Sequence, residues 1–310
     1  MGLRVVFFGS PDFATPSLDA IADRHDVVAV VTQPDRPAGR GRKLQAPAAK
    51  TLALARGLVV LQPTKLRDGV VAQQLAALKP DLFVVVAYGR ILPPDLLAVP
   101  RLGPWNVHAS ILPKFRGAAP IQWAVIRGER STGVTIMRMD AGLDTGAIAA
   151  FTTDVIRDDD TAGSLAARLS VLGASLLVET LPTIVAGSVV LRAQEDGAAT
   201  LAPPLRKEDG QLNFTQSALV VSAQARGVDP WPGATFLLQG APTKVFGPTI
   251  VTGSGKPGEV LGLLPQGLAI ACGQDAVAFA ELQIPGRKRM PAQRVLAGYP
   301  LPPGTVVGEV

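Results

Sequence analysis

The chain has 310 residues, of which 47% are hydrophobic and 18% charged, so it can bury a substantial core, has room for two domains and is not disordered. One cysteine excludes an internal disulfide framework, and with two histidines far apart in the sequence we expect no metal site. The formal net charge of +5 favours a polyanionic partner, which can be a nucleic acid, a phosphorylated substrate or an acidic membrane surface.

The start of the chain, MGLRVVFFGSPDF, does not have the charged start, apolar run and small-residue cleavage site of a signal peptide. No uncharged apolar run reaches the length of a membrane span. We therefore expect a cytoplasmic, monomeric protein with no membrane partner.

The first part of the chain alternates apolar strands with helices. We expect strands at residues 3–8, 27–32, 58–61 and 81–87, and helices at 15–23 and 68–78. Near-continuous apolar strands that alternate with helices are typical of a parallel sheet covered on both faces. The sequence therefore predicts an N-terminal α/β domain that is doubly wound and Rossmann-like, with a parallel-rich sheet.

The turn after the first strand reads GSPDF, not GxGxxG. The glycine spacing that binds a dinucleotide pyrophosphate is missing, so we expect no NAD. Ligands of such sheets still bind beyond the carboxyl ends of the strands. We therefore expect the site in the loops that follow Phe8, Thr32, Ala87 and Val107.

The pattern changes after residue 134. Two strands at 134–139 and 147–154 surround a glycine-rich turn, and 161–186 has the apolar face of a long helix. A polar segment with a Pro-Pro pair, 193–209, is interpreted as a linker. A helix at 216–226 and many short strands with glycine turns then favour a small OB-like β-barrel. The expected division is a catalytic domain at 1–192, this linker, and a C-terminal barrel at 210–310.

Asn106 and His108 are two residues apart, so in an extended segment their side chains point to the same face. An amide donor beside an imidazole suits stabilisation of an oxyanion or acid–base catalysis. A structural histidine that caps a loop is an equal alternative from spacing alone. The loop MDAGLDTG, with Asp140 and Asp144, offers a carboxylate that can orient His108 if the fold brings them together, although most such sequences are only turns.

Two segments concentrate positive charge. Residues 33–50 hold five Lys or Arg and one Asp, a net charge of +4 compared with +5 for the whole chain. Glycine and proline make 33–45 a long loop, which is either a solvated surface or a contact for a phosphate backbone. The second segment, Arg287-Lys288-Arg289 with Arg294, lies in the expected barrel, where scarce aromatic residues favour phosphate contact over base stacking.

The same residues carry a resemblance. Asn106 and His108, followed by SILPKFRGAAPI at 110–121, resemble the signature of the folate-dependent formyltransferases, and 140–146 is similar to the second signature of that family. Essentially the whole chain is similar to the members that formylate methionine on initiator tRNA, through GSPDF, QPDRPAGRGRKL, VVVAYGRILP, GAAPIQWA and the second domain. Ile111 and Phe115 replace the commoner Leu and an aromatic such as Trp, and neither touches the expected chemistry.

The resemblance implies that 10-formyltetrahydrofolate, as cosubstrate, gives its formyl group to the α-amine of methionine esterified to initiator tRNA. Asn106 and His108 would donate hydrogen bonds to the negative oxygen formed on attack, and Asp144 would keep His108 charged. The folate site is expected to use Ser110, Ile111, Leu112, Pro113, Val86, Tyr88, Leu92 and Asp140. The tRNA contacts are expected at Arg36, Arg40, Arg42, Lys43, Lys207, Arg287, Lys288 and Arg289.

Two alternatives stay open at this point. The same catalytic trio serves glycinamide ribonucleotide and sugar-nucleotide formyltransferases, but those small acceptors do not require the basic loop or a basic second domain. A non-catalytic RNA-binding module with this fold would not need Asn106, His108 and Asp144 together. The sequence therefore favours the tRNA enzyme.

Overall fold

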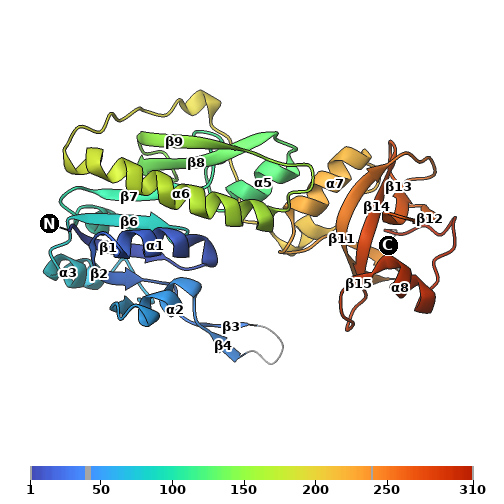
Figure 1. The fold of residues 1–310 in the computed structure, drawn as a ribbon, viewed down its shortest axis with the longest axis horizontal. Helices are drawn as coiled ribbons and strands as arrows, with labels where there is room; N and C mark the ends of the chain where they lie inside the picture. The colour runs from blue at the N-terminus through green and yellow to red at the C-terminus, as the bar shows by residue number, and fades with distance from the viewer. Residues whose placement is uncertain (1, 39–42, 239, 309–310) are drawn as a thin grey trace. The chain divides into compact units, whose positions relative to one another are not determined.

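A computed structural model describes residues 2–38, 43–238 and 240–308 (Figure 1). The chain forms two compact units, each described by itself below. The N-terminal unit contains Met1–Pro120, Thr132–Asp154 and Ala166–Ala202, and the C-terminal unit contains Ile121–Ser131, Val155–Leu165 and Pro203–Val310. The chain passes from the N-terminal unit to the last segment of the C-terminal unit between Ala202 and Pro203, within the polar stretch 193–209.

The N-terminal unit is built on a seven-stranded sheet in the order β5-β2-β1-β6-β7-β8-β9 (Figure 1). Its strands are β1 (Arg4–Gly9), β2 (Asp26–Val31), β5 (Val60–Leu61), β6 (Leu82–Val86), β7 (Pro104–His108), β8 (Ser131–Arg138) and β9 (Ile148–Val155). The pairs from β5 to β7 are parallel, and β8 is antiparallel to β7. Runs of Val and Phe buried on both faces explain the central strands. The predicted parallel-rich α/β sheet is confirmed.

The helices of this unit are α1 (Thr15–Ala22), α2 (Ala48–Ala55), α3 (Val70–Ala77), α4 (Pro94–Leu97) and most of α6 (Ala162–Val185), while α5 (Pro120–Ile126) belongs from Ile121 onward to the C-terminal unit. Helices α2, α4 and α5 were not expected from the sequence. Helix α4 has four residues and α5 has seven, so each is too short for a clear apolar period. The buried residues of α2 are Ala49 and Ala53, which are too small to give a strong apolar period.

The side chains of one sheet face pack into a core with α3 and α4. Phe8, Phe83 and Tyr88 form its aromatic centre, with ring centroids 5.0 Å apart for Phe8–Phe83 and 5.4 Å for Phe8–Tyr88. Val85 belongs to this core and is the register partner of Asn106. Register partners of neighbouring strands face the same side of a sheet, so Asn106 lies on this face as well.

Helix α6 covers the opposite face. A Cβ on Gly173 would lie 2.9 Å from Val107 and 3.3 Å from Val134, so the helix backbone approaches β7 and β8 closely. By length and composition α6 is apolar enough to cross a membrane, although it contains Arg168 and Glu179, and half of its apolar window is buried inside the protein. Its apolar length is explained by packing on the sheet.

The C-terminal unit contains an antiparallel sheet in the order β10-β11-β14-β13-β12, with β15 paired to β14. Its elements are η3 (Lys207–Gly210), α7 (Ala218–Gly227), β10 (Thr235–Leu238), β11 (Ala241–Val251), β12 (Val260–Leu264), β13 (Gly267–Ala271), β14 (Ala276–Gln283), β15 (Met290–Pro291) and α8 (Ala292–Gly298). Phe214, Phe236 and Phe279 pack edge-on in its core. This half-barrel agrees with the small barrel domain expected from the sequence.

We expect Gly173→Val to lower the free energy of unfolding by about 1–3 kcal/mol, because the added side chain overpacks the contact between α6 and the sheet. Urea denaturation measures the loss. Gly298→Val, the same exchange in α8 where no atom lies within 4 Å of the added Cβ, is the control and should change stability by less than about 0.5 kcal/mol. Equal losses in both variants would contradict the close packing of α6.

Candidate active site

Strand β7 places two functional side chains on one face of the sheet. Asn106 is the register partner of Met137 and His108 that of Thr135, while Val107 between them faces α6. His108 is 6% exposed, and the Oδ1 atom of Asn106 is buried without a hydrogen-bond partner among the described residues. A buried acceptor that the protein leaves unpaired is costly, and such a group is typical of a site that awaits a ligand.

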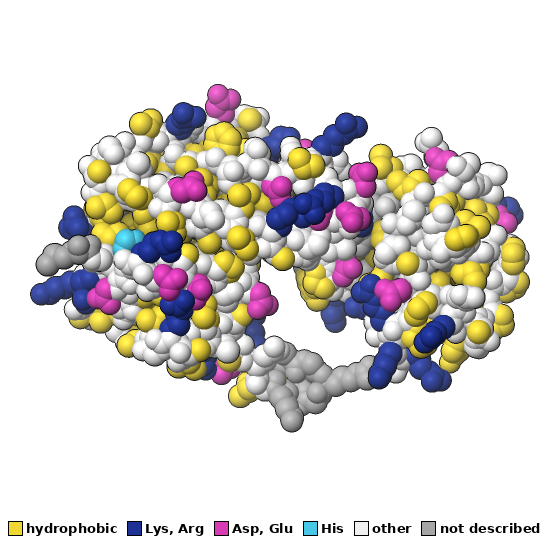
Figure 2. Space-filling model, in the orientation of Figure 1, with side chains coloured by type: hydrophobic (Ala, Val, Ile, Leu, Met, Phe, Trp, Pro, Cys, Tyr) yellow, Lys and Arg dark blue, Asp and Glu magenta, His cyan; other side chains and the backbone are white. Residues whose placement is uncertain are grey.

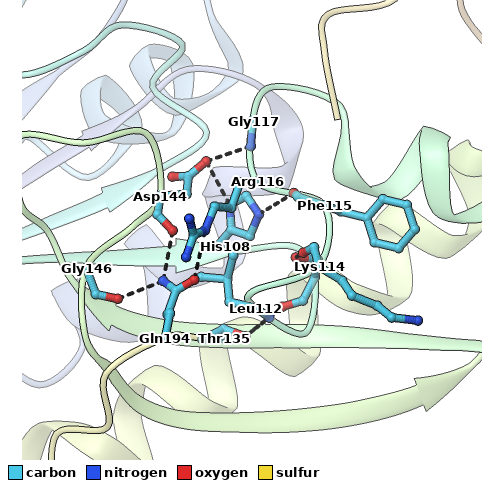
Figure 3. A network of polar contacts seen from close by, with 11 residues as sticks. His108, Leu112, Lys114, Phe115, Arg116, Gly117, Thr135, Asp144, Gly146 and Gln194 are labelled. Atoms are coloured by element: carbon cyan, nitrogen blue, oxygen red, sulfur yellow. Dashed lines mark hydrogen bonds and ion pairs between the residues drawn. The ribbon is translucent and has the colours of Figure 1, made fainter. Parts of the chain in front are cut away.

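The His108 ring lies between two oxygen acceptors (Figure 3). Its Nε2 is 3.0 Å from the carbonyl oxygen of Phe115, and its Nδ1 is 3.7 Å from Oδ2 of Asp144. A ring that carries a proton on both nitrogen atoms matches both acceptors. The fold thus brings Asp144 to His108 and places Asn106 on the same face of β7, two residues from His108. The sequence proposed these three residues as the catalytic trio.

The Asp144 carboxylate is held from two sides. Its Oδ2 accepts a hydrogen bond of 2.8 Å from the backbone N–H of Gly117, in addition to facing His108. The backbone of Asp144 has φ +52°, the left-handed conformation that few residues other than glycine adopt, and Phe115 has φ +60°. The two residues that face His108 therefore both have an unfavourable backbone conformation, which the surrounding structure maintains.

The loop after β7 is tied to β8 by Thr135. Its hydroxyl donates to the Ser110 carbonyl at 2.6 Å and accepts from the Leu112 N–H at 3.2 Å (Figure 3). Ser110 is buried and donates from Oγ to the Lys114 carbonyl at 2.6 Å. Leu112 is buried, and Ile111 and Pro113 are half-buried. The side chains of Ser110 and Leu112 therefore fix the loop, and the more accessible ones belong to Ile111 and Pro113.

Asp140 stabilises its own loop. Its Oδ1 accepts hydrogen bonds from Gly142 N–H at 3.0 Å and from the Thr145 hydroxyl at 2.7 Å. A Cβ on Gly146 would collide with the carbonyl oxygen of Arg138, so glycine closes this turn. These contacts give the Asp140 carboxylate a structural role that the sequence did not predict beside the expected ligand role.

The segment after β6 was expected to form a wall of the folate site through Val86, Tyr88 and Leu92. All three side chains are buried in the core, while Ile91 is 63% exposed. Ala87 has φ +47°, so the backbone turns sharply where β6 ends. What this segment offers to a ligand is its main chain and Ile91, rather than the three buried side chains.

The segment after β2 forms a hairpin of β3 (Arg36–Ala38) and β4 (Lys43–Gln45), where an irregular loop was expected. Lys50 anchors its base through hydrogen bonds of 2.9 and 2.8 Å to Asp35 and of 2.9 Å to Gln62. Hydrogen bonds from Lys50 and Gln62 lower the pKa of Asp35. The anchored hairpin follows the carboxyl end of β2, at the same sheet edge as the loop after β7.

Of the four basic residues expected to contact tRNA in this hairpin, the structure describes the side chain of Arg36. The Arg36 side chain is exposed and donates to Gln33 at 3.1 Å. Arg40 and Arg42 lie outside the described residues, and Lys43 is described by its backbone alone. A groove of about 1150 Å³ adjoins Arg36 and Gln45, between the hairpin and helices α1 and α2.

In the C-terminal unit, Lys207, Arg287 and Lys288 are exposed. Figure 2 shows Lys and Arg side chains gathered on the lower part of this unit, over the region where Figure 1 places β15 and α8. Arg289 is already engaged, because its Nε donates to Glu281 at 2.6 Å and its guanidinium lies 4.0 Å from the Phe246 ring centroid. Arg287 donates one hydrogen bond, to the Tyr299 hydroxyl at 3.3 Å. Lys288 is therefore better placed than Arg289 for a phosphate.

A cavity of about 560 Å³ adjoins the segment after β6. It is lined by Thr64, Lys65, Leu66, Arg67, Asp68, Arg90 and Ile91. Three cations and one carboxylate give it a positive balance. Neither Lys65 nor Arg67 was expected from the sequence, because each is an isolated charge in a segment without a motif.

The sequence also gave no signal for Gln194, which lies in the segment interpreted as a linker. Its Nε2 donates to the carbonyl oxygens of Asp144 at 2.8 Å and Gly146 at 2.7 Å, and its Oε1 accepts from Arg116 Nε at 3.0 Å (Figure 3). A polar segment without period offers no sequence signal for such a contact.

The chain matches two models of known families. Residues 3–181 match formyl transferase, and residues 204–300 match the formyl transferase C-terminal domain. The chain belongs to the formyltransferase family. It is 46% identical over 309 residues to the methionyl-tRNA formyltransferase of Geobacter sulfurreducens, covering 99% of this chain and 98% of that protein. The relative with the same name in Trichlorobacter lovleyi is 47% identical over 307 residues, covering 99% of this chain and 97% of that protein.

A solved structure shares the fold of this formyltransferase. The N-formyltransferase from Helicobacter canadensis, in complex with folinic acid and dTDP-3-aminofucose, has a TM-score of 0.67 and 19% identity, covering 89% of this chain and 99% of that one. At this identity the likeness shows the fold alone. The chemistry must therefore be argued from the site of this formyltransferase.

We expect Asp144→Asn and His108→Ala to lower the turnover of formyl transfer by about 10²–10⁴-fold. Asn at 144 keeps an acceptor for Gly117 but removes the charge that faces His108. Steady-state kinetics and thermal unfolding separate catalysis from folding. The control is Asp95→Asn, an exposed carboxylate of α4 that accepts from Leu96 N–H. Near-normal turnover in either site variant would refute the assigned roles.

Proposed function

We propose that this formyltransferase transfers the formyl group of 10-formyltetrahydrofolate to the α-amine of methionine esterified to initiator tRNA. The observation that carries the proposal is identity of 46% over 309 residues to methionyl-tRNA formyltransferase, together with the pairing of His108 with Asp144 and the place of Asn106 on the same face of β7. The product is N-formylmethionyl-tRNA for the initiation of translation.

The chemistry needs a neutral amine and a place for negative charge. A free α-amino group has a pKa near 8, roughly, so an adequate fraction is neutral at cellular pH. Its attack on the formyl carbon builds a negative oxygen, to which Asn106 can donate from Nδ2. The unpaired Oδ1 of Asn106 can accept an N–H of the attacking amine. One amide then orients both reacting groups.

His108 and Asp144 complete the charge balance. In this structure His108 Nε2 faces the Phe115 carbonyl, so a negative formyl oxygen at Nε2 would share or replace this contact. The Asp144 carboxylate on the other side stabilises the positive ring and can take up the amine proton through water. The two groups thus stabilise charges of opposite sign in the same step.

We propose that the formyl donor binds in the loops around this trio. Folate would lie against residues 110–113 and against the main chain and Ile91 of the segment after β6, because the side chains of Val86, Tyr88 and Leu92 are buried. Peptide N–H and C=O groups are the hydrogen-bonding partners that a pterin ring requires. The donor would supply the formyl carbon. Its C–N10 bond would break as the tetrahedral intermediate collapses, and the folate nitrogen would leave with the proton that the amine gave up.

The tRNA would be held by the basic residues of the hairpin and of the C-terminal unit. We propose Arg36, Arg40, Arg42 and Lys43 near the acceptor end, and Lys207, Arg287, Lys288 and Arg289 at more distant phosphates. Support comes from the exposure of Arg36, Lys207, Arg287 and Lys288 and from the net charge of +5. Phosphate contacts of this kind position the substrate and do not read its sequence.

A small acceptor is the second candidate, since the fold is shared with a sugar-nucleotide enzyme. That reading leaves the basic hairpin without a role, and the methionyl-tRNA enzymes match the chain over 99% of its length. The tRNA reaction therefore has the stronger support. We place the enzyme in the cytoplasm, where translation occurs, and propose that it acts as a monomer without a membrane partner.

The purified enzyme, incubated with 10-formyltetrahydrofolate, should formylate charged initiator tRNA much faster than charged elongator methionine tRNA. Acid-gel electrophoresis or mass spectrometry of the esterified amino acid measures the product. Free methionine and an amino-sugar nucleotide serve as small acceptors in parallel reactions. Faster formylation of a small acceptor than of initiator tRNA would reject the proposed function.

We expect Arg36→Ala and Arg42→Ala to weaken tRNA binding and to flatten its dependence on salt by about one counterion for each charge removed. Stability should change by less than about 0.5 kcal/mol, because the described contact of Arg36 is one surface hydrogen bond. The measurement is tRNA affinity at several salt concentrations.

Arg24→Ala is the control for charge. Arg24 is an exposed arginine that precedes β2, whereas Arg36 follows β2, so the two lie beyond opposite ends of this strand. If both Arg36→Ala and Arg42→Ala bind and formylate initiator tRNA like wild type, the hairpin is only a surface element.

A further inference from the structure

Residues 194–202, named here the strap, run beside the loop that follows β7. Arg116 N–H donates to the Thr200 carbonyl at 2.8 Å, and Ala202 N–H donates back to the Arg116 carbonyl at 2.8 Å. The Thr200 hydroxyl accepts from Phe115 N–H at 2.9 Å. Phe115 supplies the carbonyl that faces His108, so the strap supports one side of the imidazole through Phe115.

Gln194 carries the support to the other side of the imidazole. Its two amide hydrogens reach the carbonyl oxygens of Asp144 and Gly146, and its oxygen accepts from Arg116 (Figure 3). Arg116 is buried and also pairs with Asp196 of the strap, with Nη2 2.9 Å from Oδ1. One half-buried amide thereby joins the loop that carries Asp144 to the loop that carries Phe115.

The hydrogen bond from Gln194 to the Asp144 carbonyl is made to a residue with a strained backbone. Asp144 has a left-handed backbone, which is unfavourable for a residue with a side chain and persists only where neighbouring groups enforce it. The direction of its carboxylate depends on this backbone. Because Asp144 Oδ2 lies 3.7 Å from His108 Nδ1, a small rotation of the turn changes how the two groups interact.

We propose that Gln194 is a positioning residue, which holds the left-handed turn of Asp144 against Arg116 so that the carboxylate faces His108. The proposal rests on the function proposed above and adds to it a residue outside the catalytic trio. It also assigns the strap a task in catalysis, through the loops on both sides of His108.

The decisive variant is Gln194→Met, which keeps the length of the side chain and removes all three hydrogen bonds. Gln194→Glu keeps the acceptor for Arg116 and removes the two donors to Asp144 and Gly146. Gln224→Met is the matched control, because Gln224 Nε2 also bridges two carbonyl oxygens, those of Asp209 and Gln211 at 3.0 Å each, within the C-terminal unit. Thermal unfolding of all three variants reports whether each remains folded.

Two readouts distinguish positioning from stability. The first is steady-state kinetics with initiator tRNA, in which Gln194→Met and Gln194→Glu should lower kcat about 10–100-fold, with KM for donor and tRNA within about twofold of wild type. The second is the imidazole ¹⁵N spectrum at one fixed pH. The chain has two histidines, so His25 serves as an internal reference, and only the His108 signals should move.

The proposal is overturned if Gln194→Glu retains the kcat and His108 signals of wild type, or if Gln224→Met loses as much kcat as Gln194→Met. Should Gln194→Met fail to fold, Gln194→Glu decides alone. If wild type does not formylate initiator tRNA, yet the His108 signals still move in the Gln194 variants, the proposed function fails and the positioning role stands.

Discussion

The site depends on one arrangement, in which the His108 imidazole is held between the Phe115 carbonyl and the Asp144 carboxylate. Each of these oxygens belongs to a residue with a left-handed backbone, so the arrangement is not a minimum that either loop would reach alone. Hydrogen bonds donated by Thr135, Gly117 and Gln194 hold the two loops in these conformations. Preorganisation of this kind is what stabilises charge in a transition state.

The sheet determines where this arrangement can form. Strand β7 lies between a parallel neighbour and an antiparallel one, so the loop that leaves it lies beside a strand of opposite direction. Thr135 on β8 can therefore bond the loop that has just left β7. Behind the same strand, the missing side chain of Gly173 lets α6 approach closely and fixes the position of β7 from the other face.

Much of this could be predicted from the sequence, because periodicity and spacing act locally. The buried strands, the long helix at 162–185 and the common face of Asn106 and His108 all follow from residues close together in the chain. The contact between Asp144 and His108 could be predicted only through the family resemblance, since 36 positions separate the two residues in the sequence. The role of Gln194 could not be predicted, because its three hydrogen-bond partners are distant in the sequence. Its own segment also has no hydrophobic period that would indicate a helix or strand.

The segment after β6 shows a different limit of sequence reasoning, because its apolar residues were taken for a ligand-facing wall and are instead core. Val86, Tyr88 and Leu92 are almost fully buried, and what faces outward is peptide backbone together with the side chains of Arg90 and Ile91. A binding surface made of peptide groups is the same whatever side chains lie behind it. If folate binds here as proposed, exchanges in this core that keep the backbone path are tolerated, and those that shift it affect stability and ligand affinity together.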